Sequence, residues 1–146
     1  MSEYRLQREV DGHVLVFDEA TSERMAGIRQ KDTSAELVVR KVLHELGHRY
    51  RVRNRDLPGS PDVANRSRRW AVFVHGCYWH RHEGCRRTTT PKRNRDFWQA
   101  KFDANVKRDR RVQRELRDLG YRVVVVWECG TADPVELAHR MAQVVG

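Results

Sequence analysis

Three histidines and two cysteines lie within the eleven residues from His75 to Cys85, at the end of an apolar segment. The third and last cysteine of the chain, Cys129, follows a second apolar segment, residues 121–127. If these segments are strands whose ends meet, three thiolates and one imidazole can form one closed metal site. Such a soft donor set with a single histidine selects zinc in a tetrahedral structural site. The pattern therefore predicts a fold in which two strand ends, distant in sequence, are neighbours in space.

The candidate zinc ligands are the three cysteines, Cys77, Cys85 and Cys129, and one nearby histidine. The spacing alone does not decide between His80 and His82 as the fourth ligand. The alternative is three unrelated buried thiols, but the pattern uses every cysteine in the chain. Because an odd number of cysteines cannot pair completely as disulfides, we expect a metal site in a reducing cytoplasm.

The charge of the chain indicates a polyanionic partner. Lysine and arginine number 29 against 20 aspartate and glutamate residues in 146, for a formal net charge of +9 at pH 7. Nucleic acid is the expected polyanion, although a ribosomal or membrane-surface protein can have the same excess. Arginine makes up most of this charge and forms paired hydrogen bonds with phosphate. The sequence has no apolar run of about 18 residues and no export leader, so we expect neither a membrane span nor secretion.

Hydrophobic periodicity predicts an α/β fold, with a mixed central sheet flanked by helices. A hairpin is expected over residues 4–17, around the turn Asp11-Gly12. The face of the amphipathic helix expected over 34–47 consists of Leu37, Val38, Leu43 and Leu46. The other expected elements, in chain order, are a short helix over 20–31, a strand over 69–74, a basic loop over 86–95, a helix over 96–119, a strand over 121–127 and a helix over 134–145.

Two polar residues interrupt the apolar face of the helix expected over 96–119. Its two rows of residues spaced by seven are Phe102, Asp109 and Leu116, and Asn105, Val112 and Leu119. Asp109 and Asn105 therefore share the stripe that otherwise faces the core. A buried carboxylate or amide costs on the order of several kcal/mol unless it is paired. We expect these residues to have partners or a function, the alternative being a salt bridge from Asp109 to a neighbouring arginine.

Two further carboxylates are candidates for a role in a site. Asp62 follows the rigid turn Pro58-Gly59-Ser60-Pro61 and precedes a strand. A carboxylate held there suits Mg²⁺, and a turn-capping role fits equally well. Glu36 stands three residues after Thr33, a spacing that favours a helix capping box.

Tyr78, Trp79 and Trp98 stand beside basic loops. Aromatic rings in such places can stack on bases or enter a duplex as a wedge. An aromatic residue in a protein of this size is usually part of the core. Tyr78 and Trp79, however, lie between candidate metal ligands, and we expect them to be displayed.

Four motifs together resemble the very short patch repair (Vsr) endonucleases. They are Leu57-Pro58-Gly59-x-Pro61-Asp62, Phe73-x-His75-Gly76-Cys77-Tyr78-Trp79-His80-x-His82, Asn105-Val106-x-Arg108-Asp109-Arg110-Arg111 and Val126-Trp127-Glu128-Cys129. The resemblance covers residues 21–145. It implies a fold related to type II restriction endonucleases in residues 21–146, with residues 1–20 as an N-terminal hairpin extension. It also implies an enzyme that nicks one strand of duplex DNA beside the thymine of a T·G mismatch, the product of 5-methylcytosine deamination, with mismatch-repair proteins as further partners.

The resemblance also implies roles for individual residues. Asp62 and the main-chain carbonyl of Val74 match the ligands of the catalytic Mg²⁺, and His80 matches the residue that activates the attacking water. This assignment leaves His82 to zinc. By the same resemblance, zinc is bound by Cys77, His82, Cys85 and Cys129, and metal-bound waters and the phosphate are oriented by His75, Asp109 and Glu36. The wedge is formed by Tyr78, Trp79 and Trp98. The opposite groove is contacted by Met25 and Ile28, and Asn105 also contacts DNA.

Departures from the family pattern keep two alternatives open. Val74 stands where the family usually has threonine, Ser60 replaces a customary arginine, and an extra residue separates His82 from Cys85. One alternative is a restriction or defence-type nuclease that recognises another mismatch or a modified base. The other is a zinc-stabilised DNA-binding module without catalysis, which would not require Asp109 on an apolar stripe.

Overall fold

Four strands form the central sheet of the computed structural model, which describes residues 5–10, 13–18 and 32–145. The strands are β3 (Arg51–Val52), β4 (Val63–Asn65), β5 (Trp70–His75) and β6 (Arg122–Trp127), hydrogen-bonded in that order. β3, β4 and β5 run antiparallel to one another in turn, whereas β5 and β6 are parallel. The sheet is therefore mixed, as predicted. The strands expected over 69–74 and 121–127 correspond to β5 and β6.

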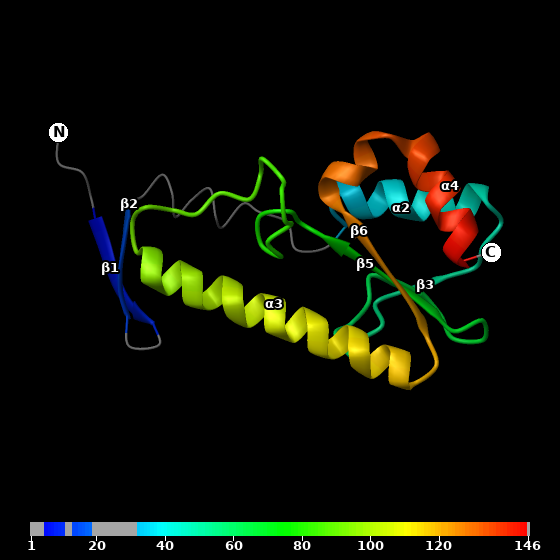
Figure 1. Cartoon of the computed structure of the whole chain (residues 1–146), viewed down its shortest axis with the longest axis horizontal. Coiled ribbons are helices and arrows are strands. Elements are labelled where there is room, and N and C mark those ends of the chain that lie inside the picture. The colour runs from blue at the N-terminus through cyan, green and yellow to red at the C-terminus, as the bar shows by residue number, and fades with distance from the viewer. Residues whose placement is uncertain (1–4, 11–12, 19–31, 146) are drawn as a thin grey trace.

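Helices cover both faces of this sheet (Figure 1). α2 (Ser34–Glu45) and α4 (Pro134–Val145) lie together on one face, and the long α3 (Arg95–Asp118) lies on the other. The expected flanking helices are thus confirmed, with bounds that differ from the predicted ones by two residues or fewer.

Side chains of β5 alternate between the two faces of the sheet and pack against the helices on both sides. Successive residues of a strand point to opposite faces. Trp70 and Val72 pack in the core beneath α2 and α4, whereas Ala71 and Phe73 pack in the core beneath α3. The chain passes from β5 to β6 through α3, and the parallel register pairs His75 with Trp127. The segments that follow these two strands therefore begin at the same edge of the sheet.

The predicted apolar face of α2 is wrong at two positions. Leu37 is 50% exposed and Leu46 is 37% exposed, whereas Ala35, Val39 and Val42 are buried. The buried residues follow the spacing i, i+4, i+7 that keeps side chains on one stripe of a helix, and Leu37 lies off that stripe. Leu46 is the C-cap, beyond the last turn. For the same reason Leu119, the C-cap of α3, is 50% exposed and does not continue its heptad row.

A separate two-stranded sheet precedes this domain. β1 (Arg5–Val10) and β2 (His13–Asp18) pair antiparallel, with Val10 opposite His13. This pairing confirms the hairpin predicted over 4–17. Its turn, Asp11-Gly12, and the helix expected over 20–31, which contains Met25 and Ile28, lie outside the described residues. Among the described helices, none is long and apolar enough to span a membrane.

Candidate functional site

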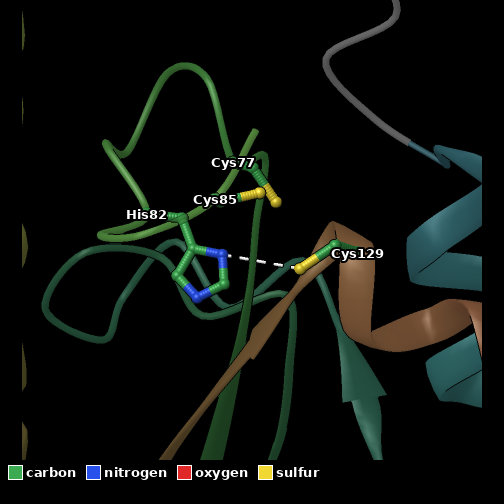
Figure 2. Close-up of side chains that lie close together, drawn as sticks. All are labelled: Cys77, His82, Cys85 and Cys129. Carbon is green, nitrogen blue, oxygen red and sulfur yellow. Dashed lines mark hydrogen bonds between the residues drawn. The ribbon is translucent and has the colours of Figure 1, made fainter. Parts of the chain in front are cut away.

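One cysteine from η1 (Glu128–Ala132) meets three residues of the loop after β5. The ligand atoms of Cys77, His82, Cys85 and Cys129 all lie within 4.8 Å of one another, as Figure 2 shows. The Sγ of Cys129 is 3.4 Å from the Nδ1 of His82. The meeting of the two strand ends predicted from sequence is therefore confirmed. The histidine that lies with the three cysteines is His82, and His80 belongs to a different group.

The electrostatics of this Cys/His cluster favour a bound cation. Burial, together with the neighbouring thiols of Cys129 and Cys85, raises the pKa of the Cys77 thiol to about 11. The backbone amide of Arg87 lowers the pKa of Cys85. Three sulfur atoms and one imidazole nitrogen are the donor set of a structural zinc site, and a coordinated thiol loses its proton outright. The residues present thus fit a zinc ion.

Trp127 links this cluster to the neighbouring histidines. The His82 ring stacks on Trp127 with centroids 4.2 Å apart and planes at 9°, and the His75 ring meets Trp127 edge-on at 5.2 Å. Trp127 belongs to one of the sequence motifs but was not predicted to be a site residue. The signal that points to it is the parallel register of β5 and β6, which sets Trp127 opposite His75.

A second group consists of His75, His80 and Asp109, whose ligand atoms also lie within 4.8 Å of one another. The Nδ1 of His80 is 2.7 Å from the Oδ2 of Asp109 on α3. A carboxylate accepts, so Nδ1–H donates, and in the neutral form of the ring the lone pair is on Nε2. The rings of His75 and His80 stack at 3.9 Å with planes 5° apart. One ion cannot lie in both of these parallel ring planes, so the arrangement suits proton transfer better than shared metal coordination.

Asp109, which lies on an otherwise apolar stripe of α3, has the partner that its position predicted. Its partner is His80, 29 residues away, and not the neighbouring arginine of the alternative. Burial and, to a smaller extent, the adjacent His80 lower the pKa of His75 to about 4. His75 is therefore neutral near pH 7. A neutral ring stacked on His80 adds no positive charge beside it.

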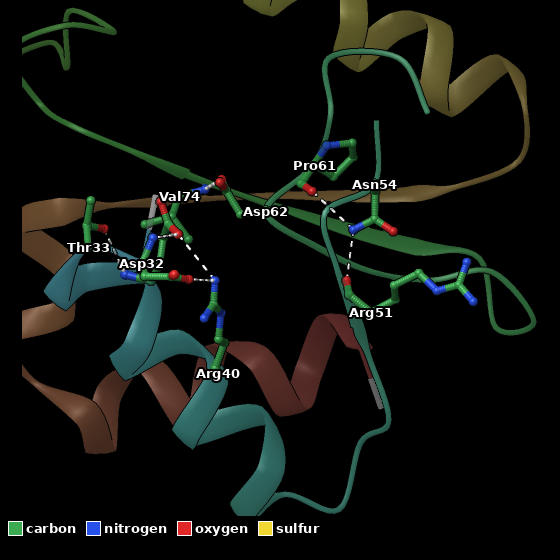
Figure 3. A network of polar contacts seen from close by, with 9 residues as sticks. Asp32, Thr33, Arg40, Arg51, Asn54, Pro61, Asp62 and Val74 are labelled. Carbon is green, nitrogen blue, oxygen red and sulfur yellow. Dashed lines mark hydrogen bonds and ion pairs between the residues drawn. The ribbon is translucent and has the colours of Figure 1, made fainter. Parts of the chain in front are cut away.

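Asp62 is held at the edge of β5. Its Oδ2 accepts a hydrogen bond of 2.6 Å from the amide of Val74 (Figure 3). Burial raises the pKa of Asp62 to about 6, against the lowering effect of the Val74 amide, and the Glu36 carboxylate raises it while His80 lowers it. The charges of Asp62, Glu36 and His80 thus act on one another. A half-buried carboxylate with a raised pKa is stabilised in its charged form by a cation.

Glu36 has the helix-capping role that its spacing predicted, with one difference. Thr33 is the N-cap of α2, and its Oγ1 accepts from the Glu36 amide at 3.2 Å. The Glu36 carboxylate accepts from the amide of Asp32 at 3.0 Å, one residue before the expected N-cap amide. It also contacts Arg40 at 3.4 Å. Although it caps a helix, Glu36 is only 8% exposed and lies in the electrostatic surroundings of Asp62.

His80 lines two cavities. The first has a volume of about 730 Å³, and its wall includes Glu36, Val74, Trp79, Trp98 and Asn105. Lys101 and Arg108 bring positive charge to the same wall. The second cavity, of about 800 Å³, lies against His75, Asp109 and the Cys/His cluster. A ligand in the first cavity would therefore meet cations, aromatic rings and the imidazole of His80.

The aromatic residues near this cavity form a packed platform. Tyr78 and Trp79 are half-buried and pack against Phe102, which is fully buried. Trp98 is only 8% exposed, so in the free protein it is a core residue that lines the cavity. The Asn105 amide donates to the carbonyl of Trp79 at 3.3 Å, which gives Asn105 the partner expected for it. The predicted display of Tyr78 and Trp79 therefore holds only for part of each ring.

Known proteins resemble this chain closely. A model of the family described as DNA mismatch endonuclease Vsr matches residues 15–87. The type II nicking enzyme V.XorIIP of Xanthomonas oryzae pv. oryzae is 44% identical over 121 residues, 83% of this chain and 88% of that protein. The DNA mismatch endonuclease Vsr of Escherichia coli is 41% identical over 115 residues, 78% of this chain and 73% of that protein. Asp109 and Cys129 lie beyond the segment that the family model matches. In the folded chain they lie beside histidines and cysteines of that segment.

Proposed function

Since this chain belongs to the Vsr family of DNA mismatch endonucleases, hydrolases that cut DNA, we propose that it nicks one strand of duplex DNA beside the thymine of a T·G mismatch in a Mg²⁺-dependent reaction. The observation that carries this proposal is the His80–Asp109 pair, in which His80 acts on the charge of Asp62 and lines a cavity with cationic and aromatic walls.

The catalytic metal in this proposal is Mg²⁺, held by the Asp62 carboxylate and the main-chain carbonyl of Val74. Oxygen donors of this kind are those that Mg²⁺ prefers. When bound, the ion would supply Lewis-acid stabilisation of the negative charge that develops on the phosphate oxygens. The raised pKa of Asp62 supports this role, because the carboxylate has no cationic side chain bonded to it among the described contacts.

His80 is the proposed general base. With Nδ1–H bonded to Asp109, the Nε2 of His80 is free to take a proton from the attacking water. Asp109 holds the ring in this tautomer and stabilises the imidazolium that forms. His75, neutral and stacked on His80, and Glu36, beside Asp62, would orient water molecules and the phosphate by hydrogen bonding.

The Cys/His cluster is proposed to hold a structural zinc ion. Its ligands are Cys77, His82, Cys85 and Cys129, which leaves no side chain of the cluster for catalysis. A closed four-ligand site of this type stabilises folding. Through Trp127 it would also fix the position of His75.

Tyr78 and Trp79 are the proposed wedge, with Trp98 and Asn105 lining the cavity behind them. A mismatched step costs less to unstack than a paired one, which gives the wedge a physical basis for selectivity. Met25 and Ile28 would contact the opposite groove. We divide the chain into an N-terminal hairpin extension, residues 1–20, and an endonuclease domain related to type II restriction enzymes, residues 21–146.

The test is the incubation of purified protein with a strand-labelled T·G duplex and Mg²⁺. We expect one nick beside the thymine, its loss in Asp62→Ala, and normal activity in Asp56→Ala. Asp56 is a matched control because it lies in the same connection between β3 and β4 but bonds Arg66 at the surface. Intact T·G duplexes in every flanking context would refute the proposal, and full activity of Asp62→Ala would remove Asp62 from the mechanism.

A second candidate function keeps the chemistry and changes the target. Val74 and Ser60 depart from the family pattern, and the relative V.XorIIP carries the name of a type II nicking enzyme. The alternative is a restriction-associated nuclease for other mismatches or modified bases. Parallel cleavage of T·G, T·T, methylated and fully paired duplexes separates the two, because only T·G should be cut under the first proposal.

A further inference from the structure

We propose that Asn54 is a positioning residue for the catalytic carboxylate of Asp62. This inference rests on the proposed function in one respect, namely that Asp62 binds the divalent ion. Asn54 has no role in the sequence motifs and lies in the segment between β3 and β4.

The Asn54 side chain is fully buried and gives both amide hydrogens to backbone carbonyls. Its Nδ2 donates to the carbonyl of Arg51 at 2.8 Å and to that of Pro61 at 3.1 Å, as Figure 3 shows. A buried amide is costly unless its hydrogen bonds are made; both hydrogens of the Nδ2 are bonded, whereas the buried Oδ1 has no hydrogen-bond partner among the described residues. Pro61 directly precedes Asp62, so the second bond fixes the peptide unit from which the Asp62 backbone starts.

The segment that Asn54 closes is a tight turn. The amide of Leu57 donates to the carbonyl of Asn54 at 3.1 Å, and the amide of Ser60 donates to the carbonyl of Leu57 at 3.0 Å. Gly59 and Ser60 both have positive φ, of +72° and +49°. Glycine adopts this conformation freely, whereas for Ser60 it is strained and is kept only where surrounding contacts hold it. The Asn54 amide is the side-chain contact that ties the two ends of this turn together.

The same turn is seated on α3. A Cβ on Gly59 would lie 2.6 Å from Val112, so the backbone of the turn is in direct contact with that side chain. Val112 stands three residues after Asp109, the partner of His80. Asp62 is thus fixed at its backbone through Asn54 and at its carboxylate through the Val74 amide. The consequence is a carboxylate with little freedom to shift relative to His80.

Removal of the Asn54 amide would leave the carbonyl of Pro61 without this donor and would let the turn relax. Groups that orient a metal ligand typically contribute about 10- to 100-fold in metal affinity. We therefore expect Asn54→Ala to weaken divalent-ion binding about 10-fold or more by this reasoning. The affinity for DNA without divalent ions should stay within about two-fold, because Asn54 is buried away from the surface.

The experiment measures Mn²⁺ binding to the zinc-loaded protein without DNA, by electron paramagnetic resonance, in wild type and variants. Asp62→Ala defines the signal of the site. Asn65→Ala is the matched control, because its amide also braces a carbonyl, that of Arg49 at 2.9 Å, but stands after Asp62 at the other end of β4. Asn54→Asp, which keeps the shape but cannot donate both bonds, replaces the alanine variant if that variant fails to fold.

The expected result is weaker Mn²⁺ binding and a higher Mg²⁺ requirement for nicking in the Asn54 variants, with Asn65→Ala like wild type. Unchanged Mn²⁺ affinity in a folded Asn54 variant, with only a lower melting temperature, would overturn the inference. So would the absence of any Asp62-dependent Mn²⁺ binding in wild type. If wild type binds Mn²⁺ through Asp62 but nicks no T·G duplex, the proposed function fails and the role of Asn54 is still measured.

Discussion

The contact between the Pro58–Pro61 turn and α3 makes a strong prediction for Gly59→Ala. The new Cβ would stand 2.6 Å from the Cγ2 of Val112, 2.8 Å from its Cβ and 3.2 Å from the Cε1 of Phe73. Real Cβ atoms do not approach other atoms below 3.0 Å, so the turn or the helix has to move. The substitution therefore tests whether this turn is packed against α3.

Two costs add in this variant. A φ of +72° is unfavourable for alanine by roughly 1–2 kcal/mol. Overpacking a tight contact costs about 1–3 kcal/mol more. We expect Gly59→Ala to lower the free energy of unfolding by about 2–5 kcal/mol in total, from these two terms.

Gly47→Ala is the control that isolates the packing cost. Gly47 also has a positive φ, +80°, but no described atom lies within 4 Å of the position of its Cβ. It should therefore show the backbone cost alone, about 1–2 kcal/mol. A second comparison uses Val112→Ala, which removes the closest atom, Cγ2, and keeps the Cβ at 2.8 Å. In that background Gly59→Ala should cost less, by a part of the packing term of about 1–3 kcal/mol.

The assay is urea unfolding of the zinc-loaded proteins, followed by circular dichroism and by tryptophan fluorescence. Zinc concentration is kept constant because a ligand bound to the native state changes apparent stability. Equal losses for Gly59→Ala and Gly47→Ala would refute the packing of the turn on α3. Additive effects of Gly59→Ala and Val112→Ala would refute the Cγ2 of Val112 as the main clashing atom.

Three further predictions concern the site. Because burial raises the pKa of Asp62 to about 6, its contribution to the stability of the metal-free protein is greatest below pH 3.8 and is lost as the pH rises through about 6. Mn²⁺ affinity should rise as the pH rises through about 6 and then level off, which titrations across pH 5–8 (roughly three pH units that include this pKa) can measure, and Asp62→Asn should not bind Mn²⁺ at this site. Cys129→Ser should lose bound zinc, measured by elemental analysis, and its melting temperature should no longer respond to a chelator; retention of one zinc per chain would exclude Cys129 as a ligand. Asp109→Asn should lower the single-turnover nicking rate by about 10²- to 10⁴-fold with DNA affinity unchanged, whereas a wild-type rate would remove the His80–Asp109 pair from proton transfer.

Features that depend only on residue type and local spacing could be predicted before the fold was known. Cysteines and histidines have few reasons to gather within a short segment, so their clustering indicated a metal site and the meeting of two strand ends. The heptad spacing of Asp109 and Asn105 on an otherwise apolar stripe likewise indicated that each needed a partner. Both expectations follow from local spacing and from the cost of burying polar groups.

The identity of the partners depended on contacts that no local pattern encodes. Asp109 pairs with His80 across 29 residues, and His82, not His80, meets Cys129 across 47 residues. Trp127 enters the site through the parallel register of β5 and β6.

The buried face of α2 and the hydrogen bonds of Asn54 also depend on contacts that no local pattern encodes. Leu37 is exposed because the shape of the sheet selects the stripe of α2 that packs against it, and a leucine off that stripe has no surface to cover it. In the sequence Asn54 is indistinguishable from an ordinary polar loop residue, and its role depends on its two carbonyl partners in the fold. Residue chemistry and the cost of burying polar groups are local properties, so the amino-acid pattern alone indicated which groups have to gather or pair. Which of these groups meet depends on how strands and helices far apart in the chain are registered against one another, and this became known from the folded molecule.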